Sequence, residues 1–379
     1  MSPAPGTVYL IGAGPGDPGL LTLRGAECLA RADVVVYDYL ASPLLLRHAR
    51  EDAERVYVGK RGGGERTEQA AITALLIERA RAGRTVARLK GGDPFIFGRG
   101  GEEAEALAAA GIPFEIVPGV TSAIAAPAYA GIPLTHRELA SSVAFVTGHE
   151  DPAKAAPAVD WARLATGADT LVLLMGVRTL PDVVARLLAH GRPPATPVAV
   201  IRWGTTPEQE TVVGTLADIV ARVEARGLAP PALAVVGEVV RLRERLAWFE
   251  AKPLFGRRIV VTRAREQASE LARTLRELGA LPIECPTIAL EPPESWAALD
   301  AALDRLGEYD WVVFTSASGV RFFLERLRTR GRDVRALGRA RICAIGPATA
   351  EAVAALGLAV DAVPAEYVAE GVVEALERA

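Results

Sequence analysis

The chain has 379 residues, of which 50% are hydrophobic, and its formal net charge is −3 at pH 7. This length exceeds one ordinary core, so we expect two or three domains. The nearly balanced charge argues against a nucleic-acid-binding protein, which would carry a basic excess. No apolar run reaches membrane-spanning length and no signal peptide precedes the first strand-like segment, so we expect a cytoplasmic protein without membrane contact.

Short β-rich runs alternate with longer helix-patterned runs, which predicts an α/β protein with mostly parallel sheets. A helix pattern begins near Leu20, after the first strand. Pro118 and Gly119 follow a strand and precede a new helix, so we place a division between two halves there. The strands expected in these halves are residues 8–11, 34–37, 55–58, 85–89, 114–117, 143–147, 170–175, 197–201 and 233–236.

A domain boundary is expected around residues 246–257, where a charged helix end gives way to a stretch with proline and glycine. A new strand at residues 258–262 begins a second α/β series, continued near 311–315 and 341–345. The expected domains are therefore 1–247, with halves of about 1–118 and 119–247, and 257–379. The cysteines Cys28, Cys285 and Cys343 lack metal-ligand spacing, so we expect buried apolar residues and no metal site.

The first glycine-rich loop, residues 12–19, follows the first strand directly. Glycines let a backbone turn sharply and approach a ligand closely. Gly14, Gly16 and Gly19 formally meet the dinucleotide-binding spacing of a nicotinamide enzyme, with Asp38 as its ribose-binding acid. Two prolines fill the positions between, and proline has no N–H to offer a pyrophosphate. Taken alone, this loop leaves a tight connection and a ligand site equally open.

Two further segments carry a stronger signal for a ligand. Residues 90–103 hold five glycines around one Asp-Pro pair, and ordering them costs entropy that a plain connector could avoid. We therefore expect this loop to face a ligand through its backbone. Residues 117–137 lead into a small-residue helix, and the hydroxyls of Thr121 and Ser122 at its start either cap the helix or meet a ligand.

Together these loops resemble those of uroporphyrinogen-III C-methyltransferases, a branch of the tetrapyrrole methylase family. The resemblance covers roughly residues 6–245, and its blocks are residues 12–19, 32–40, 58–61, 88–103, 117–137, 145–149 and 231–243. It implies two α/β subdomains with S-adenosylmethionine in the cleft between them, a small-molecule tetrapyrrole substrate and a homodimer. The implied reaction is double C-methylation of uroporphyrinogen III to precorrin-2, for sirohaem or cobalamin synthesis.

The matching motifs also imply site residues. Cofactor contacts fall at Pro15, Gly91, Gly92, Asp93, Ile96, Thr121, Ser122, Met175 and Gly204. The family pattern suggests Asp38 as proton acceptor and Lys60 as proton donor, although Asp38 could cap the following helix and Lys60 could be a surface charge. Because the substrate is rich in carboxylates, arginines should line its side of the cleft, and the candidates are Arg61, Arg99 and Arg137.

Residues 257–379 resemble the first half of uroporphyrinogen-III synthase, through blocks 259–264, 309–320, 344–350 and 365–371. A fusion of the two would join consecutive steps. The sequence stops at Ala379, before the later strands of the second lobe, so we expect an incomplete synthase-like domain without synthase activity. A chain ending near Leu246 is then expected to keep full methylation.

Three alternatives stay open at this point. The first is a tetrapyrrole methylase acting on a later cobalamin precursor. The second is a nicotinamide-dependent oxidoreductase, suggested by the glycine spacing in residues 12–19. The third is a binding module in which the C-terminal part tethers a partner.

Overall fold

The computed structural model describes residues 4–59, 68–148, 159–263 and 265–379. The chain divides into two compact units, Met1–Thr287 and Ile288–Ala379. Within the described residues, no helix has the length and apolar character that crossing a membrane requires.

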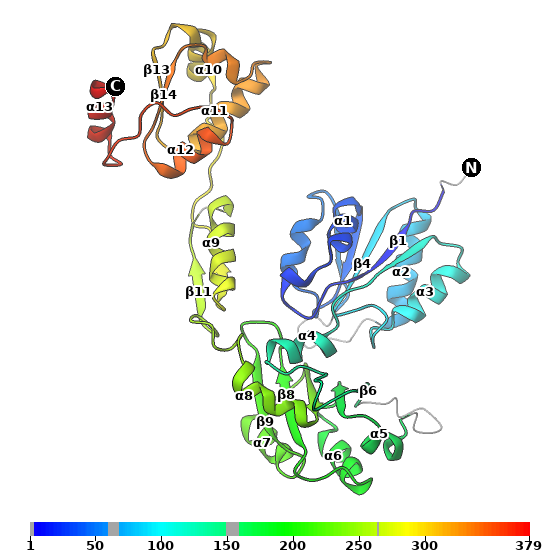
Figure 1. Ribbon diagram of the computed structural model, residues 1–379. Coiled ribbons are helices and arrows are strands. Elements are labelled where there is room, and N and C mark those ends of the chain that lie inside the picture. Colours follow the sequence, from blue (N-terminus) through cyan, green and yellow to red (C-terminus); the bar gives the residue numbers. More distant parts are fainter. Residues whose placement is uncertain (1–3, 60–67, 149–158, 264) are drawn as a thin grey trace. The chain divides into compact units, whose positions relative to one another are not determined.

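The N-terminal sheet consists of five parallel strands in the order β3-β2-β4-β1-β5. The strands are β1 (Val8–Gly12), β2 (Val34–Tyr37), β3 (Glu54–Tyr57), β4 (Val86–Lys90) and β5 (Phe114–Val117). Helix α1 (Leu23–Arg31) packs on one face, and α2 (Gln69–Arg81) and α3 (Gly100–Ala109) pack on the other (Figure 1). Because the strands are parallel, their carboxyl ends share one edge, and the glycine-rich loops follow β1, β4 and β5 at that edge.

Helix α4 (Ser122–Tyr129) leads into a second sheet with the order β6-β7-β10-β8-β9. Its strands are β6 (Val143–Thr147), β7 (Thr170–Leu174), β8 (Pro197–Arg202), β9 (Glu210–Thr215) and β10 (Ala232–Val236). Helix α4 covers one face, and the other face is covered by α5 (Trp161–Gly167), α6 (Leu180–Ala189) and α7 (Ile219–Arg226).

The expectation of mostly parallel sheets is wrong for this second sheet. Only β6 and β7 pair in parallel, whereas β10 runs antiparallel to β7 and β8, and β8 runs antiparallel to β9. Residues 203–209 between β8 and β9 are too few for the crossover that a parallel pair requires. Strand β9 is not predicted from the sequence, because it is a partly exposed edge strand without a clear apolar pattern.

A short helix, α8 (Arg243–Leu246), precedes a small two-stranded parallel sheet. This sheet consists of β11 (Arg258–Val261) and β12 (Leu281–Glu284), joined by α9 (Arg265–Glu277). Cys28 and Cys343 are buried as predicted, but the prediction is wrong for Cys285. That residue follows β12 in a stretch that is exposed from residue 283 onward, so nothing in this stretch covers its side chain.

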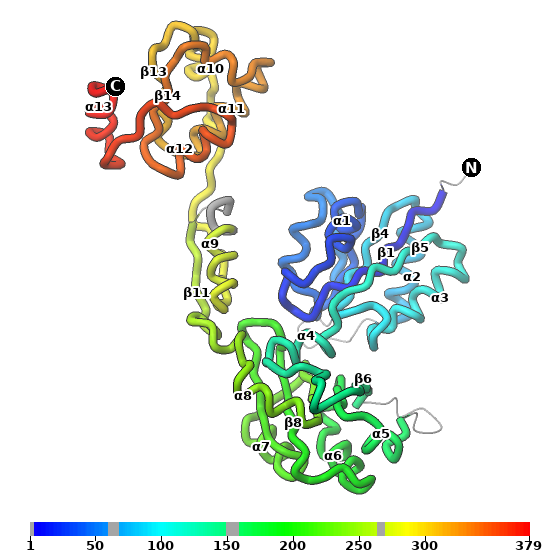
Figure 2. The backbone as a smooth tube through the Cα atoms, in the orientation of Figure 1, coloured from blue at the N-terminus to red at the C-terminus, as the bar shows by residue number. Residues whose placement is uncertain are grey.

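The second unit is built around the parallel pair β13 (Trp311–Phe314) and β14 (Arg341–Ala344). Its helices are α10 (Ala297–Asp304), α11 (Ala317–Thr329), α12 (Pro347–Ala354) and α13 (Ala369–Arg378). The core includes Leu303, Phe314, Leu327 and Val353, and Figure 2 follows the backbone through this unit. Both strands lie within one residue of the ranges that the sequence predicts.

Candidate functional site

Three glycine-containing loops meet at the carboxyl edge of the N-terminal sheet. The Gly92 N–H donates to the Gly14 carbonyl at 2.7 Å, and the Gly14 N–H donates back to the Gly92 carbonyl at 3.2 Å. A Cβ at Gly119 would lie 2.5 Å from the Gly92 carbonyl oxygen and 2.6 Å from the Gly12 Cα. The three loops therefore approach one another at a distance that only glycine permits.

Asp93 ties the second glycine loop to the third. Its Oδ2 accepts a hydrogen bond from the Gly119 N–H at 2.9 Å, and its Oδ1 accepts one from the Phe95 N–H at 2.8 Å. Both carboxylate oxygens thus hold the loop in shape. Beyond this anchor, the apolar side chains of Phe95, Ile96 and Phe97 are all exposed, at 55%, 37% and 44%.

Asp17 joins the first glycine loop to the second sheet. Its N–H donates to Thr205 Oγ1 at 3.1 Å, and its Oδ2 accepts from the Tyr129 hydroxyl at 2.7 Å. Burial, and then the bond to Asp17, raises the pKa of Tyr129, so the phenol stays a donor. A Cβ at Gly16 would lie 2.6 Å from Thr206 Cγ2, so the loop rests directly on the turn after β8.

Strained backbone follows β7 and β8. Met175, Trp203 and Thr205 have φ values of 57°, 46° and 73°, in the left-handed region that disfavours side chains. Such conformations cost on the order of 1–3 kcal/mol each and gather at ligand-binding loops. Gly204, between the last two, packs against α4, because its Cβ would lie 2.3 Å from the Ala126 Cβ.

The start of α4 faces the second glycine loop. Thr121 is the N-cap of the helix, and its Oγ1 accepts from the Ala123 N–H at 3.3 Å. A Cβ at Gly92 would lie 3.7 Å from both the Ser122 nitrogen and the Thr121 Cα. The capping role that the sequence left open is therefore present, and the cap also lies beside the glycine loops.

Of the predicted cofactor residues, the structure brings together those in the loops after β1, β4, β5 and β8. They are Pro15, Gly91, Gly92, Asp93, Thr121, Ser122 and Gly204. Ile96 extends from the same loop as Asp93 into solvent. Met175 lies at the end of β7, outside the contacts described above, and 53% of it is exposed.

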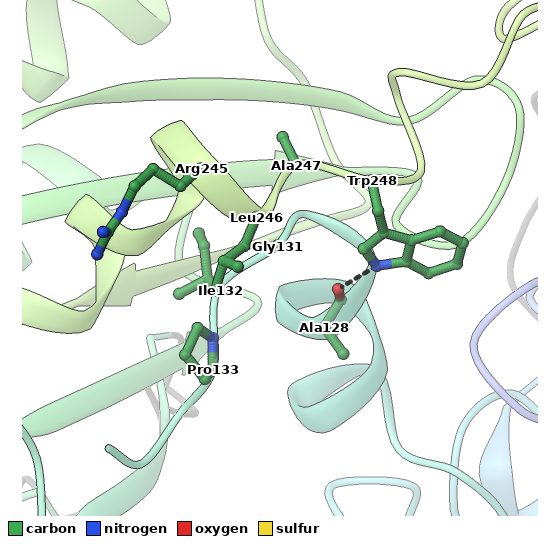
Figure 3. A pocket seen from close by; sticks show the side chains of 8 residues that line it. All are labelled: Ala128, Gly131, Ile132, Pro133, Arg245, Leu246, Ala247 and Trp248. Atoms are coloured by element: carbon green, nitrogen blue, oxygen red, sulfur yellow. Dashed lines mark hydrogen bonds between the residues drawn. The ribbon is translucent and has the colours of Figure 1, made fainter. Parts of the chain in front are cut away.

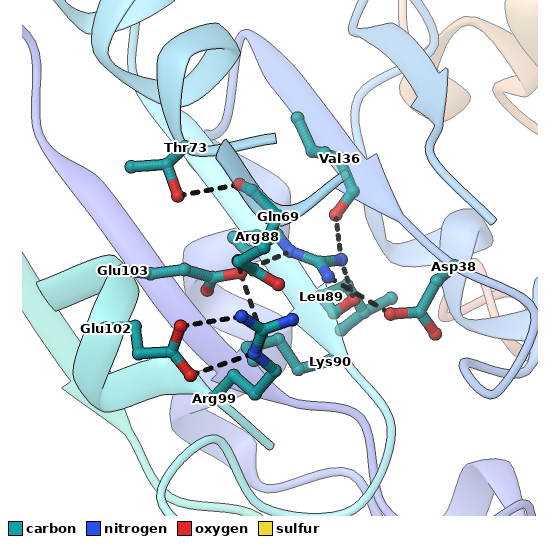
Figure 4. A network of polar contacts seen from close by, with 10 residues as sticks. All are labelled: Val36, Asp38, Gln69, Thr73, Arg88, Leu89, Lys90, Arg99, Glu102 and Glu103. Atoms are coloured by element: carbon teal, nitrogen blue, oxygen red, sulfur yellow. Dashed lines mark hydrogen bonds and ion pairs between the residues drawn. The ribbon is translucent and has the colours of Figure 1, made fainter. Parts of the chain in front are cut away.

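A cluster of buried charges lies beside Asp38 (Figure 4). Arg88 and Lys90 of β4 are 3% and 4% exposed, and Glu103 of α3 is fully buried. The Oε1 of Glu103 is 2.9 Å from Lys90 Nζ and 3.4 Å from Arg88 Nε, and it also accepts from Gln69 Nε2 at 2.8 Å. Arg88 Nη2 lies 3.1 Å from Asp38 Oδ2. The cluster therefore balances two cations against two carboxylates.

Burial dominates the electrostatics of this cluster. It lowers the pKa of Lys90, as does the neighbouring charge of Arg88, whereas Glu103 acts in the opposite direction. The Oε2 of Glu103 is buried without a hydrogen-bond partner. Arg88, Lys90 and Glu103 are not among the site residues that the sequence predicts. A signal is present in the sequence, because two basic residues alternate with an apolar one at the end of a strand that is otherwise apolar.

The remaining predicted residues are distributed as follows. Lys60 and Arg61 lie outside the described residues. Arg99 has a φ of 59° directly before α3, and its Nη2 lies 2.7 Å from Glu102 Oε2, beside the buried cluster (Figure 4). Arg137 is exposed in a turn closed by the bridge between His136 and Ala140.

A pocket of about 550 Å³ opens elsewhere in the same unit (Figure 3). It is lined by Ala128, Gly131, Ile132, Pro133, Arg245, Leu246, Ala247 and Trp248. None of the predicted site residues lines it, and Arg245 is the single charged residue of its wall. The described residues also contain no group of three or more His, Cys, Asp or Glu side chains that could hold a metal ion. We therefore place the candidate site at the glycine loops.

Two family models match the chain. Residues 7–220 match the Tetrapyrrole (Corrin/Porphyrin) Methylases, and residues 269–379 match Uroporphyrinogen-III synthase HemD. A uroporphyrinogen-III C-methyltransferase of Bacillus subtilis (strain 168) is 45% identical over 332 residues, which are 88% of this chain and 68% of that protein. The porphyrin biosynthesis protein HemD of Ruminiclostridium josui is 42% identical over 359 residues, which are 95% of this chain and 71% of that protein.

A solved structure agrees with these matches. The uroporphyrin-III C-methyltransferase of Thermus thermophilus, complexed with S-adenosylhomocysteine, is 43% identical and has a TM-score of 0.53. The match covers 62% of this chain and 100% of that protein. The methylase model spans more than half of the chain, and the relatives above cover most of it. The chain therefore belongs to the tetrapyrrole methylases, and its C-terminal part is a uroporphyrinogen-III synthase (HemD) domain.

Proposed function

We propose that the methylase part transfers two methyl groups from S-adenosylmethionine to uroporphyrinogen III and so forms precorrin-2. The observation that carries this proposal is the meeting of the Gly12, Gly92 and Gly119 backbones at the sheet edge where Asp38, with its partly buried carboxylate, follows β2. The B. subtilis relative is named for this activity, and the T. thermophilus relative was solved with the demethylated cofactor.

The loops suit a cofactor that is bound mainly through backbone groups. Side chains at Gly12 or Gly119 would collide with backbone atoms, so only glycine lets the backbones of the three loops gather at this edge of the sheet. We assign to cofactor binding Pro15, Gly91, Gly92, Asp93, Ile96, Thr121, Ser122, Met175 and Gly204. Asp93 contributes indirectly, because its two carboxylate oxygens fix the shape of the loop of residues 90–103. When bound, S-adenosylmethionine supplies the methyl group.

Asp38 is our candidate for the proton acceptor. Its side chain is 23% exposed, so a substrate proton can reach it. Arg88 contacts Oδ2, and the Leu40 N–H donates to Oδ1 at 3.1 Å, so the carboxylate has a fixed orientation. We keep Lys60 as proton donor, and we assign the substrate carboxylates to Arg61, Arg99 and Arg137.

The first prediction concerns ligand choice. Isothermal titration should show S-adenosylhomocysteine binding with a dissociation constant in the micromolar range or below, and no heat with NAD or NADP. Mass spectrometry should detect a doubly methylated product from uroporphyrinogen III and S-adenosylmethionine. Nicotinamide binding without sulfonium binding would favour the oxidoreductase. Methylation of later cobalamin precursors alone would favour the other methylase, and binding of neither cofactor would favour the binding module.

We further propose that the methylase part ends after Phe255 and not at residue 247. Phe249 is 3% exposed, and its ring lies 4.8 Å from the Tyr129 ring and 5.4 Å from the Phe255 ring, centroid to centroid. Lys252 Nζ lies 5.2 Å from the Phe249 ring centroid. These contacts argue against the expectation that a chain ending near Leu246 keeps full methylation.

The second prediction compares two truncations. A chain ending at Leu246 loses Phe249 and should be less stable than a chain ending at Gly256 by about 3 kcal/mol, the usual cost of removing a buried aromatic ring. Urea denaturation of the two chains measures the difference. If the two chains have equal urea midpoints of unfolding and methylate uroporphyrinogen III equally well, the methylase part ends at residue 247 as the sequence predicts.

A further inference from the structure

A chain of hydrogen bonds connects the segment after the second sheet to the first glycine loop. Glu250 Oε1 accepts from Gln209 Nε2 at 2.8 Å and from Thr211 Oγ1 at 2.7 Å. Gln209 Oε1 accepts from the Thr205 N–H at 2.9 Å, and Thr205 Oγ1 accepts from the Asp17 N–H at 3.1 Å. Glu250 is thus linked to the loop of residues 12–19 through two intermediate side chains.

The two central residues of this series of hydrogen bonds are buried. Gln209 is 5% exposed and Thr205 is 2% exposed. Because the Gln209 amide presents its oxygen to the Thr205 N–H, its NH₂ group needs another acceptor, and Glu250 is that acceptor. Without Glu250 a buried donor would stay unpaired, and the amide would lose the partner that orients it. Thr205, with its φ of 73°, depends on such bonds to hold a strained conformation.

Glu250 is itself held in place. Its Oε2 pairs with Arg243 Nη2, and Arg243 Nη1 donates to the Ala130 carbonyl at the end of α4. Beside it, the Trp248 indole N–H donates to the Ala128 carbonyl at 3.0 Å (Figure 3). The segment around Glu250 is therefore fixed to the C-terminal end of α4.

A second route from this segment reaches the same loop. The Phe249 ring packs edge-on against Tyr129, whose hydroxyl donates to Asp17 Oδ2 at 2.7 Å. Asp17 is thus held on its backbone through Thr205 and on its carboxylate through Tyr129. Both contacts depend on residues that pack against the segment 243–250.

We propose that Glu250 is a positioning residue for the cofactor, which acts by holding the loop of residues 12–19 against the turn at residues 203–206. This proposal rests on the proposed function, because both loops carry residues that we assign to S-adenosylmethionine. The methylase model ends at residue 220 and the synthase model begins at residue 269, so neither covers Glu250. The segment between the two matched regions is then part of the methyltransferase site.

Glu250→Ala in the full chain tests the proposal. The dissociation constant for S-adenosylhomocysteine should rise by about 10- to 100-fold, as expected when a buried hydrogen-bond donor loses a charged acceptor. The KM for uroporphyrinogen III should stay unchanged, because Arg99 and Arg137, which we assign to the substrate, take no part in these hydrogen bonds. Glu244→Ala is the matched control, since Glu244 is exposed on α8 and should bind cofactor as the wild type does.

Exchanging the glutamine and the glutamate at positions 209 and 250 distinguishes a positioning role of Glu250 from a general loss of folding. Gln209→Glu places a second carboxylate against Glu250 and should weaken cofactor binding as strongly as Glu250→Ala. Adding Glu250→Gln reverses donor and acceptor, keeps an acceptor for the Thr205 N–H, and should restore most of the affinity. If Glu250→Ala fails to fold by circular dichroism, this pair decides the question.

Two results would overturn the proposal: unchanged cofactor affinity in Glu250→Ala and Gln209→Glu, or no recovery in the double variant. A wild-type protein that binds no S-adenosylhomocysteine would instead contradict the proposed function.

Discussion

Replacing Gly119 by alanine should abolish S-adenosylhomocysteine binding. The new Cβ would lie 2.5 Å from the Gly92 carbonyl oxygen and 2.6 Å from the Gly12 Cα, and both are backbone atoms that no rotamer change can move. Relief requires the three loops to separate at the edge where we place the cofactor. We expect the dissociation constant to rise at least about 1,000-fold, which corresponds to about 4 kcal/mol of binding free energy. Isothermal titration measures it.

Gly167→Ala is the control for this substitution. Gly167 ends α5, and a Cβ there would meet nothing within 4 Å, so the variant should bind cofactor normally. Gly119 is a sharper probe than Gly92, where a Cβ would meet no atom closer than 3.7 Å and a φ of 70° would be the main obstacle. Normal binding by Gly119→Ala would show that the close approach of these loops does not form the cofactor site.

The strands of the fold were largely predictable from the sequence, but their pairing was not. Strands β2, β5 and β6 have the bounds that the sequence predicts, because each is a short run rich in β-branched and aromatic residues. Strand β9 is a partly exposed edge strand with mixed polarity, and β12 contains Pro282, so neither gives a clear pattern. The antiparallel position of β10 between β7 and β8 depends on contacts between distant segments, which periodicity does not record.

The part of the candidate site that consists of glycine-rich loops was predictable from the sequence. The loop around Gly92 stands out in the sequence because its glycines have no purpose in a plain connector, whereas the loops around Gly14 and Gly119 gain their meaning from the family resemblance. The buried partnership of Arg88 with Asp38 did not stand out, because these residues are 50 positions apart and meet only across two paired strands. The sequence does not predict Glu250 either, because its contact with the buried Gln209 amide joins residues 41 positions apart.

Asp38→Asn should leave S-adenosylhomocysteine affinity unchanged and lower turnover by about 10²- to 10⁴-fold, the usual loss when one positioned proton-transfer group is removed. Asparagine has nearly the same size and keeps an oxygen that can accept from the Leu40 N–H. It accepts no proton at neutral pH, and it gives up the charge that pairs with Arg88. The measurements are the rate of doubly methylated product and the dissociation constant of S-adenosylhomocysteine. Lys60→Ala should behave in the same way.

This substitution separates the two roles that the sequence left open for Asp38. If Asp38 only caps the turn that follows β2, asparagine caps it equally well, and the variant should be fully active. If Asp38 accepts the proton, turnover falls although the fold and the cofactor affinity persist. Asp52→Asn is the control, because Asp52 is exposed and pairs with Arg50 at the surface, so its loss should leave turnover unchanged. Full activity in Asp38→Asn would therefore reduce Asp38 to a structural residue and move the search for the base to other carboxylates near the glycine loops.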